Sequence, residues 1–237
     1  MAPTSRLYLT RHAQAEHNVD LDYTIPDAPL TPLGRKQASS LAHTIPSHLQ
    51  TRVDLLVSSP LKRTLQTTLL GWNPVVQRLG KENIICLPEA QECNDHPCDT
   101  GSSRQELEAN PEFECLNLER LTEDWTSKRG IYSADREVIA ERAMKVRQFL
   151  REREEEEIVV VAHGDILRQI TATVDGPGTY SWRNAEMRVY RFDSGSVESE
   201  DCWLTLEEVV EVTGGFAPTS TEMDIPGEEK GKVNGKI

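Results

Sequence analysis

Short apolar runs of the kind that form buried strands recur along the chain, at Arg6–Thr10, Asp54–Val57, Asn83–Leu87 and Ile158–Ala162. The run IVVVA at Ile158–Ala162 is continuous and mostly β-branched, which is typical of a strand buried on both faces of a parallel sheet. Two later runs, Met187–Phe192 and Cys202–Val210, predict strands that close the fold.

Segments with helical patterns separate these strands. In Leu30–Ile45, Thr31 is a candidate N-cap with Pro32 at the first helical position, and Leu33, Leu41 and Ile45 share one face. Further helices are expected from Ser58-Ser59-Pro60 to about Leu70, over Asp135–Glu157 and after His163-Gly164-Asp165. Alternating strands and helices predict an α/β fold, a three-layer α/β/α sandwich with a mostly parallel central sheet.

Two stretches depart from this alternation. Residues 93–133 are polar and irregular, with Phe113, Trp125 and Tyr132 scattered among them. Residues 214–237 are rich in Gly, Pro, Ser and charge and predict a disordered tail, because they cannot build a core. One domain is therefore expected at 1–213.

Composition narrows the classes of partner. With 26 Lys and Arg against 39 Asp and Glu, the net charge of -13 disfavours nucleic acid and anionic membrane surfaces. It leaves room for a small anionic substrate, since a local group of Arg and His inverts the potential inside a cleft. An odd number of cysteines without CxxC spacing, and no apolar run of about 18 residues, predict a cytoplasmic protein with reduced thiols.

Histidines and arginines follow the predicted strands where each strand ends. Arg11-His12 comes after the first strand, Arg63 lies one turn into the helix after the second, and His163-Gly164 follows IVVVA. Because ligands of open α/β sheets bind at the carboxyl ends of the strands, these side chains predict one anion site.

Such a site suits phosphoryl transfer. Arginine binds phosphate bidentately, and a histidine serves as a covalent nucleophile. A carboxylic acid must protonate the leaving oxygen, and Glu92 in LPEAQE follows the third predicted strand at the same edge. No metal or cofactor is required if guanidinium groups neutralise the phosphate.

Four segments of the chain resemble the motifs of the histidine phosphatase (phosphoglycerate-mutase-like) superfamily, in the order of that family. They are LYLTRHAQAEHN, SSPLKRTLQT, LPEAQE and VVVAHGDILR, and Ala13 stands where the family usually has glycine. The resemblance implies that residues 93–133 form the variable insertion that covers the active site.

The resemblance also assigns roles by position. It implies that His12 forms a phosphohistidine, that Glu92 is the proton donor, and that His163 assists at the same site. Arg11, Arg63 and His163 are expected to bind the phosphate, with Asn18 in support and Gly164 allowing close backbone passage. Glu89 is the rival of Glu92, and His17, His43 and His48 are interpreted as ordinary surface or turn histidines.

The activity expected is hydrolysis of a small organic phosphate ester. A mutase of the phosphoglycerate type is the alternative, but the segment after the acid is acidic and would hold a substrate carboxylate poorly. A non-catalytic relative that binds a phospho-ligand is the other alternative. The aromatic residues of 93–133 suggest a substrate with an apolar portion.

The cluster Cys93, Asp95, His96 and Cys98 lacks the spacing of a structural zinc site and is interpreted as a loop. Oligomeric state has no signature in the sequence.

Overall fold

The computed structural model describes residues 4–210, 215 and 217–219. Six strands are present: β1 (Arg6–Arg11), β2 (Leu55–Ser58), β3 (Ile85–Cys86), β4 (Glu157–Ala162), β5 (Met187–Phe192) and β6 (Leu204–Val210). The α-helices are α1 (Pro32–Thr44), α2 (Ser47–Arg52), α3 (Lys62–Gly71), α4 (Asn73–Leu79), α5 (Arg104–Glu108), α6 (Arg136–Arg151) and α7 (Gly164–Ile170). Short 3-10 turns lie at Glu16–Asn18, Lys81–Asn83, Pro88–Ala90, Pro97–Asp99, Pro111–Phe113 and Gly130–Tyr132.

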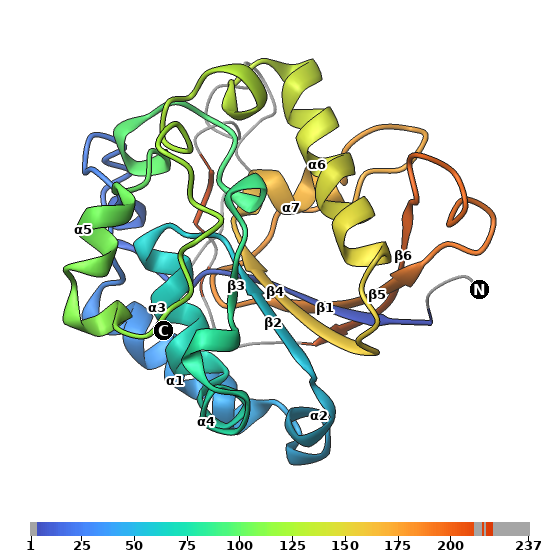
Figure 1. The fold of residues 1–237 in the computed structure, drawn as a ribbon, viewed down its shortest axis with the longest axis horizontal. Helices are drawn as coiled ribbons and strands as arrows, with labels where there is room; N and C mark the ends of the chain where they lie inside the picture. The colour runs from blue at the N-terminus through green and yellow to red at the C-terminus, as the bar shows by residue number, and fades with distance from the viewer. Residues whose placement is uncertain (1–3, 211–214, 216, 220–237) are drawn as a thin grey trace, which may run out of the picture.

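The strands form one central sheet in the order β3-β2-β4-β1-β5-β6 (Figure 1). Strands β1 to β4 are parallel, whereas β5 runs antiparallel to β1 and β6 antiparallel to β5. Parallel pairing aligns the carboxyl ends of β1, β2 and β4, so that Thr10 and Ser58 are both paired with Val161. His12, Ser59 and His163, which follow these strands, therefore start from one edge.

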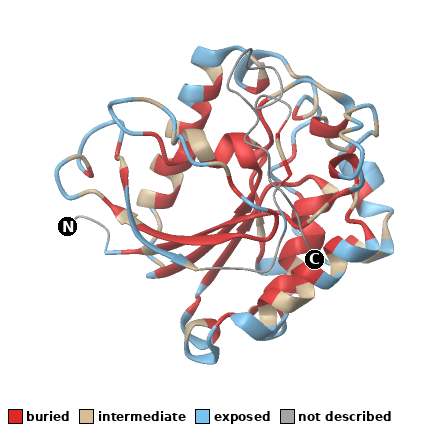
Figure 2. Ribbon diagram, turned by 180° about the vertical axis from the view of Figure 1, so that it is seen from behind, coloured by how far each residue is buried: buried red, intermediate tan, exposed pale blue. Residues whose placement is uncertain are grey.

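Helices cover both faces of the sheet, which confirms the predicted three-layer architecture. Alternate residues of β1 point to opposite sides, as the two-residue period of a strand requires. Leu7 and Leu9 join the core beneath α6 and α7, while Tyr8 joins the core beneath α1 and α4. In Figure 2 the strands β1 to β5 are mostly buried, whereas the edge strand β6, the outer helix faces and the loops are exposed. All six residues of β4 are buried, as the run IVVVA predicted.

The ends of the helices follow local chemistry. The Thr31 hydroxyl accepts a hydrogen bond from the Gly34 amide, which confirms the predicted N-cap ahead of Pro32. The expectation for Leu33 is wrong, because this side chain is 52% exposed. Helix α6 ends at Arg151 rather than at the predicted Glu157. The carboxylates that follow Arg151 are unfavourable at the negative end of the helix dipole. The amides of Glu156 and Glu157 donate to the Asp54 carboxylate instead of continuing the helix.

The insertion at 93–133 has a small core of its own. Phe113, Trp125 and Tyr132 are buried there together with Leu61 and Leu65 of the α3 region. Their side chains hold the insertion onto the domain and do not line the cavity at His12. The aromatic residues therefore give no support to the expected apolar portion of the substrate.

The expected tail at 214–237 lies outside the described residues except for Gly215 and residues 217–219. Ala217 and Thr219 are buried, and both contact residues at the carboxyl edge of the sheet. No helix in the described ranges has the length and apolar composition needed to cross a bilayer.

Replacing a buried residue of β1 tests this assignment of the core. Leu9 is fully buried between the sheet and the α6–α7 layer, so Leu9→Ala should lower the free energy of unfolding by about 2–5 kcal/mol in urea titrations. Leu33→Ala, at an exposed position of α1, is the matched control and should change it by less than about 0.5 kcal/mol. Equal effects of the two substitutions would contradict the described packing.

Candidate active site

Three elements bring their side chains together at the carboxyl edge of the sheet. His12 follows β1, Arg63 lies in the first turn of α3, and His163 caps α7 after β4. The His12 and His163 rings are 5.2 Å apart between centroids, edge to face. The predicted convergence of these three residues is present in the structure.

His12 is held in one orientation by its backbone and its ring. Its amide donates to the Ala162 carbonyl of β4 (2.9 Å), and its carbonyl accepts from the Ala185 amide (3.1 Å). The ring Nδ1 lies 2.7 Å from the Ala13 carbonyl oxygen, which can only accept, so Nδ1 carries the proton. The lone pair of Nε2 is therefore available for attack on a phosphorus atom.

Arg63 ties the insertion to the histidines. This fully buried guanidinium donates from Nε to His163 Nδ1 (3.1 Å) and from Nη2 to the Asp99 carboxylate (2.9 Å), and Nη1 contacts the Cys98 carbonyl. Because His163 Nδ1 accepts from Arg63, its proton lies on Nε2, which donates to Ser59 Oγ at 2.7 Å.

Arg11 is bound by backbone carbonyls on the other side of His12. Its Nη1 donates to the carbonyls of Trp182 and of Ala217 (2.8 Å for the latter). Gly164 lies directly beside it: a Cβ built there would stand 3.4 Å from Arg11 Nε and 2.5 Å from the Thr219 methyl carbon. The close backbone passage expected of Gly164 is thus present.

The carboxylate of Glu92 lines the cavity at His12, while Glu89 borders a different cavity with Leu87 and Phe149. The Glu92 oxygens accept from the amides of Cys93 and Ile166 (both 3.0 Å) and of Asp165 (3.3 Å). Burial and, secondarily, the nearby Asp99 carboxylate raise the pKa of Glu92. The geometry favours Glu92 over Glu89 as the acid at this site.

A buried cation and a half-buried cation of later segments also hold Glu92 in place. Arg142 of α6 donates to the Gln91 and Glu92 carbonyls (3.0 and 3.3 Å), and Lys128 Nζ donates to the Glu92 carbonyl (3.2 Å). Burial lowers the pKa of Lys128 to about 8. Neither residue, nor Asp99, was predicted from the sequence. Arg142 lies in a helix with many charged residues, so the sequence does not distinguish its inward-pointing side chain from the exposed ones.

His17 was interpreted as an ordinary surface or turn histidine, and this was wrong. It is 6% exposed, lines the cavity, and its ring lies 5.9 Å from that of His12. Asn18, predicted as a phosphate ligand, uses its amide locally: Oδ1 accepts from the Ala15 amide (3.0 Å) and Nδ2 contacts His17 Nε2 (2.9 Å).

The imidazoles of the site are neutral because charge is disfavoured there. Burial, and then the positive charges of Arg63 and Arg11, lower the pKa of His12 well below its ordinary value. Burial, Arg63 and His12 do the same to the pKa of His163. Burial and the two arginines lower the pKa of His17 to about 2. His12 is therefore neutral in the physiological range, with its Nε2 unprotonated.

The cavity at His12 is small, about 10 Å³, which is the room of roughly one water molecule. Thr219 forms part of its lining and donates to the Asp165 carboxylate at 2.7 Å. His12 itself is only 1% exposed. A phosphate group can therefore reach His12 only when part of this lining has moved.

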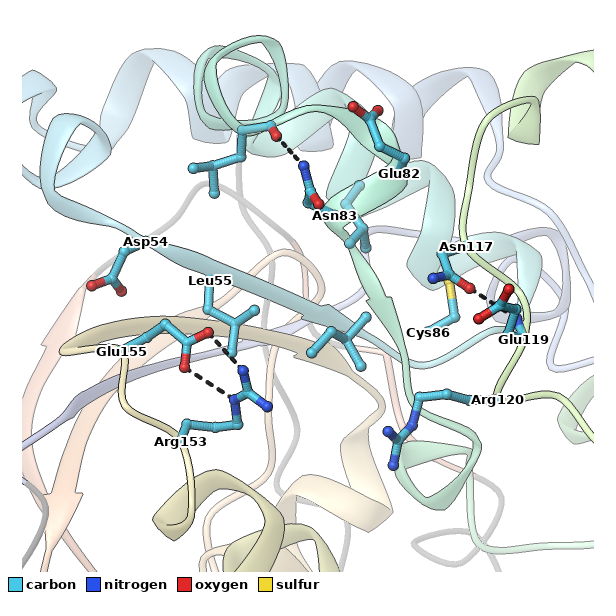
Figure 3. A pocket seen from close by; sticks show the side chains of 13 residues that line it. Asp54, Leu55, Glu82, Asn83, Cys86, Asn117, Glu119, Arg120, Arg153 and Glu155 are labelled. Carbon is cyan, nitrogen blue, oxygen red and sulfur yellow. Dashed lines mark hydrogen bonds and ion pairs between the residues drawn. The ribbon is translucent and has the colours of Figure 1, made fainter.

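A larger cavity, of about 550 Å³, lies at the opposite edge of the sheet, where β2 and β3 begin (Figure 3). Its lining contains no histidine, and three of its charged groups are engaged with other groups. Arg153 pairs with Glu155 at 2.8 Å, Asp54 accepts from two amides, and Arg120 stacks on Phe149. The chemistry of a reactive site is therefore concentrated at His12.

No cluster of three His, Cys, Asp or Glu suited to a metal ion occurs within the part of the chain that the structure describes. Cys93 and Cys98 are buried free thiols on a loop beside the site, with pKa values raised by burial. His96 of the same loop stacks on Tyr23, with ring centroids 5.5 Å apart.

Comparison with known proteins agrees with this geometry. Residues 7–202 match the histidine phosphatase superfamily (branch 1). A Schizosaccharomyces pombe protein called "Probable phosphatase" is 29% identical over 166 residues, covering 68% of this chain and 75% of that protein. Phosphoglycerate mutase-like protein 1 of Arabidopsis thaliana is 32% identical over 197 residues, covering 68% of each chain.

Solved structures share the fold. A phosphoserine phosphatase mutant from Entamoeba histolytica, crystallised with phosphoserine, superimposes with a TM-score of 0.53 at 20% identity. The match covers 87% of this chain and 96% of that one.

The buried neutral histidines predict a dependence of stability on pH. Below the ordinary histidine pKa of about 6.5, the unfolded chain takes up protons that the folded protein does not. The free energy of unfolding should therefore fall as the pH drops from 7 to 5, by at most about 1.4 kcal/mol per pH unit for each histidine. Glu92, with its raised pKa, acts in the opposite direction but is a single group.

Urea unfolding at a series of pH values measures this slope. His163→Gln should reduce it, and His43→Gln, at an exposed position of α1, should leave it unchanged. A slope insensitive to His163 would contradict the neutral, buried state of that ring.

Proposed function

This chain belongs to the histidine phosphatase superfamily, and we propose that it is a metal-independent phosphomonoester hydrolase acting through a phosphohistidine on His12. The observation that carries the proposal is the free Nε2 lone pair of His12, fixed by the Nδ1 contact with the Ala13 carbonyl and flanked by Arg11, Arg63 and His163. The expected substrate is a small organic phosphate ester. The five free thiols support the expected cytoplasmic location.

In the first step, His12 Nε2 attacks the phosphorus atom and the P–O bond to the leaving group breaks. The leaving oxygen takes a proton from Glu92, whose raised pKa keeps a protonated fraction available. His12 then carries the phosphoryl group on Nε2 and a proton on Nδ1, and the Ala13 carbonyl accepts from that proton.

In the second step, the Glu92 carboxylate accepts a proton from water as the water oxygen attacks phosphorus. The P–N bond breaks and its electron pair returns to His12 Nε2, which leaves inorganic phosphate and restores both side chains. The guanidinium groups supply positive charge to the phosphoryl oxygens in both steps, so the chemistry requires no metal ion.

Arg11, Arg63 and His163 are the proposed phosphate ligands, with Gly164 making room for them and Asn18 in support. Without a ligand, Asp99 and the carbonyls of Cys98, Trp182 and Ala217 accept from some of the N–H groups of the two arginines. A bound phosphate would accept from other N–H groups of the same guanidinium groups or take the place of Asp99 on Arg63.

Hydrolysis is favoured over a mutase activity because the insertion brings Asp99, an acid, into the cavity. A substrate carboxylate would meet this negative charge, with Lys128 as the nearby cation of the insertion. A mutase remains the alternative function, since relatives carry phosphoglycerate mutase-like names.

Turnover of an aryl phosphate in excess chelator tests the proposal directly. The wild-type protein should retain its activity, and His12→Ala should lose it by at least about 10³-fold, because the nucleophile is gone. Wild type quenched in alkaline detergent during turnover should carry one base-stable, acid-labile phosphoryl group that the variant lacks. His43→Ala is the control and should match the wild type.

Loss of activity in chelator would overturn metal independence. Transfer to a sugar acid without release of phosphate would establish the mutase instead. Binding of phosphate without turnover of any ester would indicate a non-catalytic relative.

The role of Glu92 predicts the pH dependence. Activity needs the protonated acid in the first step, so kcat/KM should fall as pH rises through the pKa of Glu92, and the optimum should lie on the acidic side. Asp99→Asn removes a negative charge that raises this pKa, so the basic limb of the profile should move to lower pH. Asp95→Asn, on the exposed part of the same loop, is the control and should leave the limb in place. Movement to higher pH in Asp99→Asn would exclude Glu92 as the acid.

A further inference from the structure

The buried ring of His17 stands beside the nucleophile without a role in the motifs that define the site. We infer that His17 is a substrate-binding residue whose neutral Nδ1–H donates a hydrogen bond to the phosphoryl group transferred to His12. The inference rests on the proposed function, because it concerns the same phosphoryl group.

The hydrogen-bond network determines which nitrogen of His17 carries the proton. Asn18 Oδ1 is identified as the oxygen because it accepts from the Ala15 amide (3.0 Å) and from Asn184 Nδ2 (3.4 Å). Asn18 Nδ2 is therefore a donor, and at 2.9 Å it donates to His17 Nε2. A neutral imidazole that accepts at Nε2 carries its proton on Nδ1.

This Nδ1–H is a donor without a partner. The atom is buried and makes no hydrogen bond within the described residues. A buried donor left unsatisfied destabilises the fold, and such groups in native proteins call for an explanation. A ligand that reaches His12 would supply the missing acceptor.

The position of the ring fits that ligand. His17 lines the cavity together with Arg11, His12 and Glu92, and its ring centroid is 5.9 Å from that of His12. His163 stands at a similar separation, 5.2 Å. A phosphoryl group on His12 Nε2 would thus have two imidazoles nearby, and of these His163 already donates its one N–H to Ser59, whereas the Nδ1–H of His17 is unused among the described residues.

Charge explains why a neutral donor suits this place. Arg11 and Arg63 already bring two positive charges, and with burial they lower the pKa of His17 to about 2. His17 therefore donates one hydrogen bond at every working pH without adding a third charge to the empty site. Asn18 acts on the phosphate through His17, as the group that fixes the tautomer.

A purely structural role gives a different expectation. The His17 ring lies 6.4 Å from Tyr23, which stacks on His96, so the ring could serve only as the inner member of this stack. In that case an apolar residue of similar volume would replace it, and an asparagine would be worse. The donor role requires the reverse order.

The experiment compares His17→Leu and His17→Asn with the wild type in vanadate binding by titration calorimetry and in kcat/KM on an aryl phosphate. Loss of a hydrogen bond to a charged group should weaken both in His17→Leu by roughly 10- to 100-fold. His17→Asn keeps an N–H donor near the position of Nδ1 and should recover most of this loss. Thermal unfolding of each variant checks that it is folded.

His96→Leu is the matched control, one ring further from the site in the same stack, and should change vanadate affinity by less than about twofold. Nitrogen-15 spectra of the wild type at pH 7 should show His17 as the Nδ1-protonated neutral tautomer, with a shift on addition of vanadate. The Nε2-protonated tautomer, or equal vanadate affinity in His17→Leu and wild type, would overturn the inference.

The two proposals fail separately. Vanadate binding that depends on His17, without turnover of any ester, would contradict the proposed hydrolase function but support the role of His17 in binding. Turnover through His12 with vanadate affinity independent of His17 would do the opposite.

Discussion

A buried guanidinium needs hydrogen-bond partners, and each of the three nitrogens of Arg63 has one, which joins three parts of the chain. It lies in α3, it donates to His163 at the start of α7, and it pairs with Asp99 of the insertion. Breaking a buried charge pair on one side costs several kcal/mol, so these segments are held at fixed positions around the site. This one side chain fixes the tautomer of His163, ties the Asp99 turn of the insertion to α3 and, together with Arg11, supplies positive charge near His12.

The site combines strong positive charge with neutral imidazoles, inside a protein whose net charge is -13. Burial first, and then the charge of Arg63, lower the pKa of both His12 and His163, and Arg11 adds to the effect on His12. In the proposed function, the same positive charge would bind the phosphate and preserve the lone pair of His12. Burial and the Asp99 carboxylate raise the pKa of Glu92. The carboxyl group therefore favours its protonated form at the same site where the imidazole of His12 favours its unprotonated form.

The strand pattern and the motifs predicted the sheet and the convergence of His12, Arg63 and His163, because buried runs and the ends of parallel strands obey local rules. Asp99, Lys128 and His17 were missed for a shared reason. Their roles depend on the conformation of the insertion and of the turn after β1, which the hydrophobic periodicity of the sequence does not predict. His17 had one signal, its position directly before Asn18, but only the Asn18 amide network shows which nitrogen is free. The length of helix α6 was overestimated because the carboxylate run after Arg151 reads as helical by propensity alone.

The near-complete burial of His12 has a consequence for how selectivity is measured. Where a ligand binds only after the lining of this cavity opens, its apparent dissociation constant is the intrinsic one divided by the open fraction. The factor is common to every ester, so it raises all the Michaelis constants together. Ratios between substrates are unaffected, and they report the contacts inside the site, whereas absolute affinities also report how often it opens.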